Sequence, residues 1–125
     1  MGKGIALSIK EMYPNAYQAY KTQERRDGLR LGHVSYSEEP NNLIVMNGIT
    51  QKDYWIPSAP RDKRYVDYGA IALVFEQVAK WANYYNVPVH FPAVGSGLGG
   101  GDWSIIEPII HEQLKGIEHY LWRLK

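Results

Sequence analysis

The sequence has no cysteine. This absence excludes a disulfide framework, a thiol nucleophile and every cysteine-ligated metal site. Long hydrophobic runs are missing too: none approaches the roughly 18 residues of a membrane-spanning helix. The N-terminus also lacks the pattern of a signal peptide. The lack of a membrane-spanning run and of a signal-peptide pattern favours a cytoplasmic protein without a membrane partner, whereas the lack of cysteine leaves the compartment open.

Neither charge sign is in excess. The chain has 14 Lys and Arg against 13 Asp and Glu, which gives a net charge of +1. Such a balance lacks the long-range field of dedicated nucleic-acid-binding proteins, so we do not expect nucleic acid as a partner. At 125 residues and 45% hydrophobic side chains, the chain is long enough for one core and too short for two. We expect a single domain over residues 1–125.

Hydrophobic spacing predicts helices and strands that alternate through the second half of the chain. The expected elements are, in order, a short helix from Gly4 to Met12, a helix at 15–28, strands at 33–37 and 41–50, a long loop at 52–64, a helix at 66–85, a strand at 87–94, a helix that ends at Gly116 and a strand at 117–122. Tyr13 separates the first two helices, because a residue before proline is driven out of the α region. The alternation favours an α/β sandwich.

Five glycines stand within the seven residues from Gly95 to Gly101, between an apolar run and the start of a helix. Such a cluster costs conformational entropy unless the backbone turns sharply or approaches a ligand closely. A strand, a glycine-rich loop and a helix N-terminus favour an anion, because free N–H groups and the helix dipole point at it. The spacing of Gly95, Gly97 and Gly100 matches a dinucleotide-binding fingerprint, but too little chain follows for that fold. We expect a phosphate-binding loop of another kind, with a merely connecting turn as the alternative.

A second glycine pair, Gly2 and Gly4 around Lys3, also leads into a predicted helix. Two such loops at one edge of a sheet would direct two helix N-termini at one diphosphate. The spacing therefore predicts a site that neither loop forms alone.

The helix after the glycine cluster has two candidate N-caps, Asp102 and Ser104. Ser104 and Glu107 have the spacing of a capping box. Pro108 favours this later start, because proline is tolerated in the first turn and harmful beyond it. Aspartate is itself a preferred N-cap, so we expect Asp102 to act as a cap first. A role in holding a water molecule or a ribose is compatible with capping.

Two stretches, "MGKGIALSIKEMYPNAYQAY" and "VHFPAVGSGLGGGDWSIIEPII", together resemble the macro domain family, in the branch of phage-type ADP-ribose 1″-phosphate phosphatases and DNA-de-ADP-ribosylating antitoxins. "NGITQKDYW" and "RYVDYGAIALVFEQVAKWA" fit the same branch, so the resemblance covers nearly the whole chain. It implies a three-layer α/β/α sandwich with a mixed sheet that binds ADP-ribose. The ligand-binding residues that it implies are Gly2, Lys3, Gly4, Ile5, Ala6, Gly95, Ser96, Gly97, Leu98, Gly99, Gly100, Gly101, Trp103 and Tyr120.

The resemblance implies hydrolysis of ADP-ribose 1″-phosphate to ADP-ribose and phosphate, without a cofactor, in a bacterial or phage-infected cell. Two alternatives stay open: a binding module without turnover, and a glycohydrolase that removes ADP-ribose from modified nucleic acid or protein. Glycohydrolases of this branch have a lysine where this chain has Gln51, and some have an aspartate where it has Gly99. A glutamine amide is not a nucleophile, which weakens the glycohydrolase reading. Asp102 and Gln51 are the candidate catalytic residues.

Members of the family have further residues ahead of the stretch that begins "MGKGIA", and these residues hold two strands. We therefore expect an N-terminally truncated version of the fold, with unpaired sheet edges where an inner strand is missing. A homodimer or strand exchange is the expected way to complete the sheet.

The four histidines, His33, His90, His111 and His119, share no metal-ligand spacing, so we predict no metal site. Tyr120, on the last expected strand, corresponds to a family position near the adenine. An aromatic ring there can stack on the base, and ordinary packing on the strand is the alternative.

Overall fold

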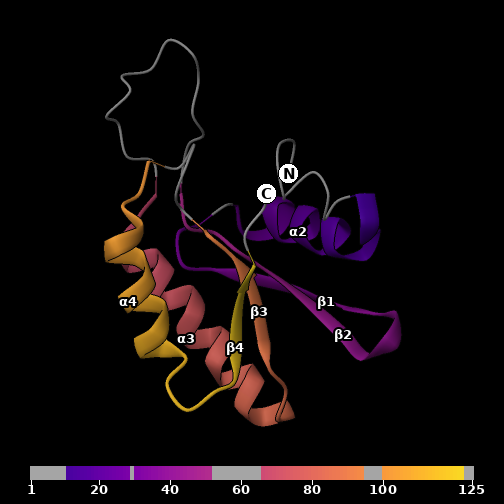
Figure 1. Cartoon of the computed structure of the whole chain (residues 1–125). Helices are drawn as coiled ribbons and strands as arrows, with labels where there is room; N and C mark the ends of the chain where they lie inside the picture. The colour runs from indigo at the N-terminus through magenta and orange to yellow at the C-terminus, as the bar shows by residue number, and fades with distance from the viewer. Residues whose placement is uncertain (1–10, 29, 52–65, 95–99, 123–125) are drawn as a thin grey trace.

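The computed structural model of the chain describes residues 11–28, 30–51, 66–94 and 100–122. Its elements are α2 (Pro14–Asp27), β1 (Val34–Glu39), the 3-10 turn η1 (Pro40–Asn42), β2 (Leu43–Gly48), α3 (Tyr68–Tyr85), β3 (Val89–Pro92), α4 (Trp103–Gln113) and β4 (His119–Trp122) (Figure 1). Each expected element within these ranges is present, with ends shifted by a few residues. The expected break at Tyr13 and the expected end of α2 at Gly28 are both confirmed. The long loop at 52–64 lies outside the described residues.

The strands form two two-stranded sheets. β1 and β2 are an antiparallel hairpin whose register runs from Val34 opposite Gly48 to Glu39 opposite Leu43. β3 and β4 are parallel, and α4 lies between them in the chain as the crossover that parallel pairing requires. Both orientations expected of a mixed sheet are thus present. Within the described residues, however, β2 and β3 are not hydrogen-bonded to each other.

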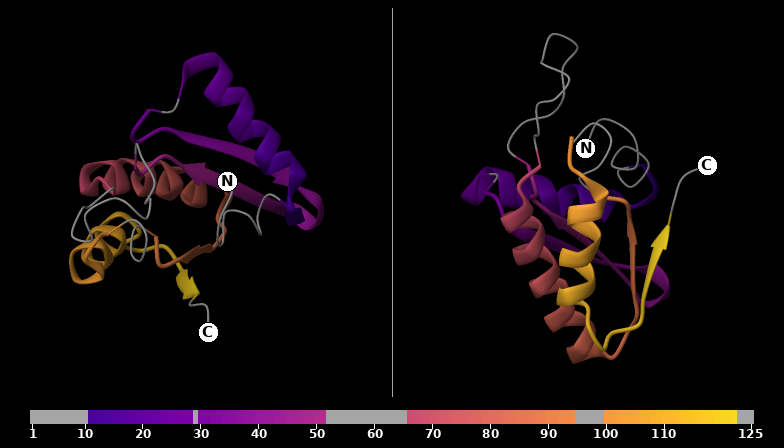
Figure 2. Two further views of the ribbon diagram at one scale, coloured as in Figure 1. Left: turned by 90° about the horizontal axis from the view of Figure 1, so that it is seen from above. Right: turned by 60° about the vertical axis from the view of Figure 1, so that its left-hand side comes forward.

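Helices α2 and α3 lie on opposite faces of the β1–β2 hairpin (Figure 2). On one face, Asn47 donates from Nδ2 to the carbonyl oxygen of Ala16 in α2, at 3.4 Å. On the other face, a Cβ added to Gly48 would lie 2.3 Å from Cγ1 of Val74 in α3. Successive strand residues point to opposite faces, so these two contacts fix the orientation of β2. Helix, sheet and helix form the layers of the expected sandwich.

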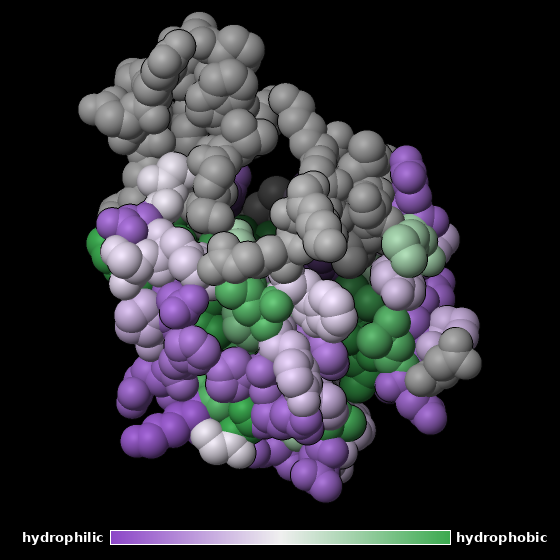
Figure 3. All heavy atoms as spheres, viewed as in Figure 1, coloured by the Kyte–Doolittle hydropathy of each residue, from purple (hydrophilic) through white to green (hydrophobic). Residues whose placement is uncertain are grey.

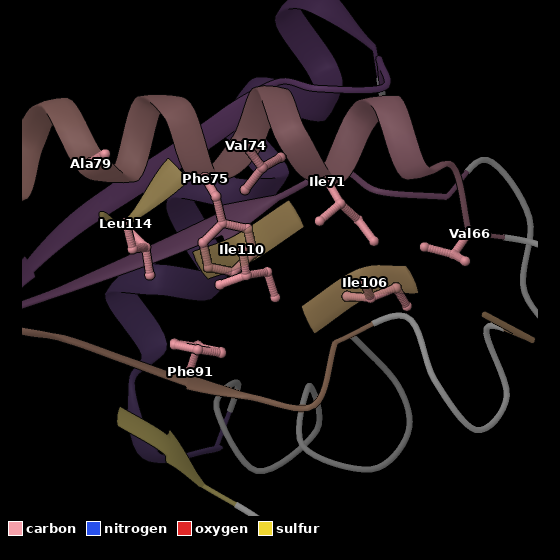
Figure 4. Close-up of a cluster of buried hydrophobic side chains, with 9 residues drawn as sticks. All are labelled: Val66, Ile71, Val74, Phe75, Ala79, Phe91, Ile106, Ile110 and Leu114. Carbon is pink, nitrogen blue, oxygen red and sulfur yellow. The ribbon is translucent and has the colours of Figure 1, made fainter. Parts of the chain in front are cut away.

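The main core lies between α3, α4 and β3 (Figure 4). Its buried members are Val66, Ile71, Val74, Phe75, Ala79, Phe91, Ile106, Ile110 and Leu114. The rings of Phe75 and Phe91 meet edge to face with centroids 5.5 Å apart, a favourable arrangement for two aromatic quadrupoles. This cluster fixes α4, and with it the polar residues at the start of α4, against α3.

One face of the molecule is shown in Figure 3 with its residues coloured by hydropathy. On the face drawn in Figure 3, hydrophobic residues appear in small groups among hydrophilic ones. Among the described residues, no helix combines the length and the hydropathy that crossing a membrane requires.

Candidate functional site at the helix N-termini

Asp102 is the N-cap of α4. Its Oδ1 accepts hydrogen bonds from the backbone N–H of Ser104 at 2.9 Å and from the Ser104 hydroxyl at 2.6 Å. The expected capping box of Ser104 and Glu107 is wrong, because Ser104 is the donor and Asp102 the acceptor. Glu107 accepts instead from Nε1 of Trp103 at 2.7 Å. A carboxylate is a stronger acceptor than a hydroxyl, so Asp102 and not Ser104 caps the helix. The helix therefore begins at Trp103, two residues earlier than a Ser104 cap would place it.

The early start leaves Pro108 inside α4 rather than in its first turn. A proline there has no N–H to donate to the carbonyl of Ser104, four residues earlier. Ser104 and Pro108 are both exposed, so water can reach this carbonyl. The helix also ends earlier than expected, at Gln113, and Gly116 follows in a turn with φ of 82°.

Tyr68 joins the N-termini of α3 and α4. Its hydroxyl oxygen accepts from the backbone N–H of Asp102 at 3.1 Å. Tyr68 is the first residue of α3, whose N-cap, Asp67, accepts from the N–H of Ala70 at 2.8 Å. Two capped helix N-termini therefore lie at the same end of the molecule (Figure 1). Their dipoles and free N–H groups favour an anion at this end.

Gln51 lies beside the start of α3. It forms an isolated antiparallel bridge with Val66, and the neighbouring Thr50 carbonyl accepts from the N–H of Asp67 at 2.7 Å. Gln51 is half-buried. The two candidate catalytic residues thus both lie near the start of α3, Gln51 through its bridge to Val66 and Asp102 through its hydrogen bond to Tyr68.

The two hydrogen bonds from Ser104 lower the pKa of the Asp102 carboxyl, the hydroxyl contributing more than the backbone N–H. Both bonds are made to the ionised form and stabilise it. Asp102 is therefore a carboxylate at neutral pH, which suits a cap and also a residue that orients a water molecule.

Replacing Asp102 by asparagine is expected to destabilise the protein at neutral pH and much less in acid. A depressed pKa in the folded state contributes stability above the unfolded value of about 3.9, and this stability is lost as the pH falls through the folded value. Urea unfolding of both proteins between pH 7 and pH 3 measures the gap in free energy of unfolding. Ser104→Ala should reduce the same pH dependence. A difference between the parent and Asp102→Asn that stays constant from pH 7 to pH 3 would contradict a lowered pKa of Asp102.

Three of the expected ligand residues lie at the entry to α4. Gly100 has φ of 72°, a left-handed conformation that favours glycine, and Gly101 is half-buried. Trp103 follows as the first residue of the helix. The expected residues outside the described ranges are Gly2, Lys3, Gly4, Ile5, Ala6, Gly95, Ser96, Gly97, Leu98 and Gly99. Convergence of the two glycine loops therefore stays a prediction.

Tyr120 packs on the face of the β3–β4 sheet. Its ring stacks on His90, with centroids 5.0 Å apart, and its hydroxyl donates to Glu118, which raises the pKa of Tyr120. Trp122 donates from Nε1 to Nδ1 of the same histidine at 2.8 Å. Sequence analysis missed this aromatic group of His90, Tyr120 and Trp122. The two-residue spacing of Tyr120 and Trp122 on one strand could have indicated that both rings lie on the same face of the sheet.

His111 and His119 form a pair. Nδ1 of His111 lies 2.8 Å from Nε2 of His119, and Nδ1 of His119 donates to the carbonyl of Ile117 at 2.7 Å. Among the described residues, no group of three or more His, Cys, Asp or Glu side chains could hold a metal ion.

The chain is similar in sequence to DNA ADP-ribosyl glycohydrolases and in structure to macrodomain proteins. No family model matches the chain. A DNA ADP-ribosyl glycohydrolase of Mycobacterium tuberculosis is 33% identical over 112 residues, which are 86% of this chain and 29% of that protein. A macrodomain protein from Streptomyces coelicolor superposes with a TM-score of 0.78 at 28% identity, over 98% of this chain and 78% of the other. A Bacteroides thetaiotaomicron protein of unknown function gives a TM-score of 0.86 at 28% identity, with the same coverage.

The chain spans about a third of the curated relatives that it matches. Those relatives are named for an activity on DNA. They give no support to the expectation, drawn from net charge, that nucleic acid is not a partner.

Proposed function

Because the chain belongs to the macro domain family, we propose that it binds ADP-ribose or a derivative of it and hydrolyses ADP-ribose 1″-phosphate to ADP-ribose and phosphate. The observation that carries this proposal is the hydrogen bond between Tyr68 and Asp102, which brings the N-termini of α3 and α4 together at one end of the molecule. The glycine-rich entry to α4 lies at the same end. A diphosphate is the kind of ligand that such an end favours.

In the proposed mechanism, the glycine loops hold the diphosphate and present the terminal phosphate. Backbone N–H groups at the start of α4 stabilise the charge that develops as the phosphoryl group passes to water. Asp102 caps the helix through Oδ1 and orients the attacking water with the rest of its exposed carboxylate. Without a covalent nucleophile, catalysis rests on positioning, and we expect slow turnover.

A second candidate function is removal of ADP-ribose from modified DNA. The names of the curated relatives favour it, and the amide of Gln51 counts against a mechanism with an amine nucleophile. Binding of ADP-ribose without turnover is the third possibility. We further propose that the protein acts in the bacterial cytoplasm and that it forms a homodimer.

Calorimetric titration of ADP-ribose into the chain, followed by an assay for released phosphate, tests the proposal. We expect saturable binding of one ligand per chain and release of phosphate from ADP-ribose 1″-phosphate. Saturable binding without release would support the binding module instead. Absence of binding by a folded chain would overturn the proposed function. Light scattering on the same sample gives the oligomeric state.

Replacing Gln51 by lysine is expected to raise the rate at which ADP-ribose is released from an ADP-ribosylated DNA oligonucleotide. An amine can attack the anomeric carbon, whereas an amide nitrogen cannot, because its lone pair is delocalised. Gln51→Met, which has similar length and no amine, is the matched control. Equal rates for the parent and both variants would show that an amine at this position is not enough for glycohydrolysis.

A further inference from the structure

Two histidine rings meet where the chain turns back from α4 into β4 (Figure 1). His111 lies in the last turn of α4, and His119 is the first residue of β4. Nδ1 of His111 and Nε2 of His119 are 2.8 Å apart, whereas the ring centroids are 5.0 Å apart. The two nitrogens therefore point toward each other. The two histidines are eight positions apart in the chain, which is not a common metal-ligand spacing, so only the turn reveals the pair.

The ring of His119 is held in one orientation. Its Nδ1 donates to the carbonyl oxygen of Ile117 at 2.7 Å. A carbonyl oxygen has no proton to give, so Nδ1 carries the proton of the neutral ring and Nε2 holds a lone pair directed at His111. The same ring stacks on Phe91 of the main core, with centroids 6.2 Å apart and an interplanar angle of 30°. His119 therefore presents a fixed lone pair to its partner.

The ring of His111 has a carboxylate on its far side. Nε2 of His111 lies 3.9 Å from Oε1 of Glu107, one turn earlier on α4. A carboxylate there favours a proton on Nε2 and leaves the lone pair on Nδ1, which faces His119. Two lone pairs at this distance repel each other unless a cation, either a proton or a metal ion, lies between them. A carboxylate and a backbone carbonyl are the partners that usually orient metal-binding histidines.

We propose that Nδ1 of His111 and Nε2 of His119 bind a divalent transition-metal ion such as Zn²⁺. Imidazole nitrogens suit zinc, copper and nickel, whereas Mg²⁺ and Ca²⁺ take oxygen ligands. On a tetrahedral zinc ion with bonds of about 2.0–2.1 Å, two nitrogen ligands lie about 3.3 Å apart. The side chain of His111 is 55% exposed, so it has room for the shift of roughly half an ångström that this requires. Water molecules complete the coordination, because the described residues contain no group of three such ligands.

The bound ion would join the end of α4 to the start of β4. Helix α4 is the crossover between the parallel strands β3 and β4, so the metal would fasten this crossover to the sheet. A ligand that binds only the folded chain stabilises it. His111 lies about 13 Å along the axis of α4 from its N-cap, Asp102. The metal site is thus separate from the candidate functional site, and the inference does not depend on the proposed function.

Calorimetric titration of zinc chloride into the chain, prepared without a polyhistidine tag, tests the proposal. We expect one Zn²⁺ per chain, at least tenfold weaker binding by His111→Gln and by His119→Gln, and no binding of Mg²⁺. His90→Gln, which removes an exposed histidine outside the pair, is the matched control and should keep the parent affinity. Equal affinity in the parent and both variants of the pair would show an adventitious ion only and overturn the proposal. Absence of saturable binding would also overturn it and leave a shared proton between the two rings.

NMR spectra of the histidine ring nitrogens test the same site in the parent protein, so the result stands even where a variant does not fold. We expect Zn²⁺ to shift the signals of Nδ1 of His111 and Nε2 of His119, while the other nitrogen of each ring keeps its proton. The rings of His33 and His90 should not respond. A shift at Nε2 of His111 instead of Nδ1, or equal shifts at all four histidines, would mean that zinc binds single surface rings, and the proposal would fail.

Discussion

Replacing Ile106 by alanine is expected to lower the free energy of unfolding by about 2–5 kcal/mol, the usual range for a buried isoleucine. Ile106 is 0% exposed and lies in α4 within the cluster that includes Ile71 and Phe75. Removing three carbons leaves a cavity that the surrounding side chains fill only partly. Urea unfolding monitored by circular dichroism measures the change.

The adjacent residue provides a matched control for Ile106→Ala. Ile105 is 43% exposed on the same helix, so Ile105→Ala removes the same atoms from a half-solvated position. Its effect should be much smaller, about 1 kcal/mol or less. Equal losses for the two variants would mean that the packing of α4 differs from that described here. The backbone N–H of Ile106 also bonds to the carbonyl of Asp102, so loosening this turn should disturb the candidate site as well.

Replacing Gly100 by valine is expected to weaken ADP-ribose binding at least tenfold, which corresponds to about 1.4 kcal/mol. Gly100 has φ of 72°, and a β-branched residue is strongly disfavoured in this left-handed region. The backbone must rearrange to relieve the strain, at the point where the chain enters α4. Calorimetric titration of ADP-ribose measures the affinity.

The variant Gly100→Asn tests whether Gly100→Val acts through backbone strain or through the presence of any side chain at this position. Asparagine tolerates the left-handed region far better than valine, so Gly100→Asn should keep most of the affinity. Unchanged binding by a folded Gly100→Val protein would exclude a role for this backbone conformation in the site. Equal loss in both variants would point to steric exclusion of the ligand by any side chain.

Much of the fold was predictable from local patterns. The break at Tyr13 and the end of α2 at Gly28 follow from what proline and glycine do to the backbone. The strand, glycine cluster and helix around Gly100 were predicted from spacing, whereas the family was identified from the resemblance of whole stretches of the sequence. The N-cap of α4 was not decided by spacing, because Asp102 and Ser104 both had suitable chemistry. Which oxygen accepts depends on the three-dimensional arrangement of their side chains.

The sequence by itself determined the order of the elements and the glycine-rich entry to α4, because these depend on residues close together in the chain. The family followed from the resemblance of stretches that cover nearly the whole sequence. Only the tertiary structure decided that Tyr68 bonds to Asp102, 34 positions away, and so brings two helix N-termini together. It also decided that β2 and β3 face each other across a cavity instead of pairing. Strand pairing and contacts between helices join residues far apart in the chain, and no local pattern fixes which partners meet.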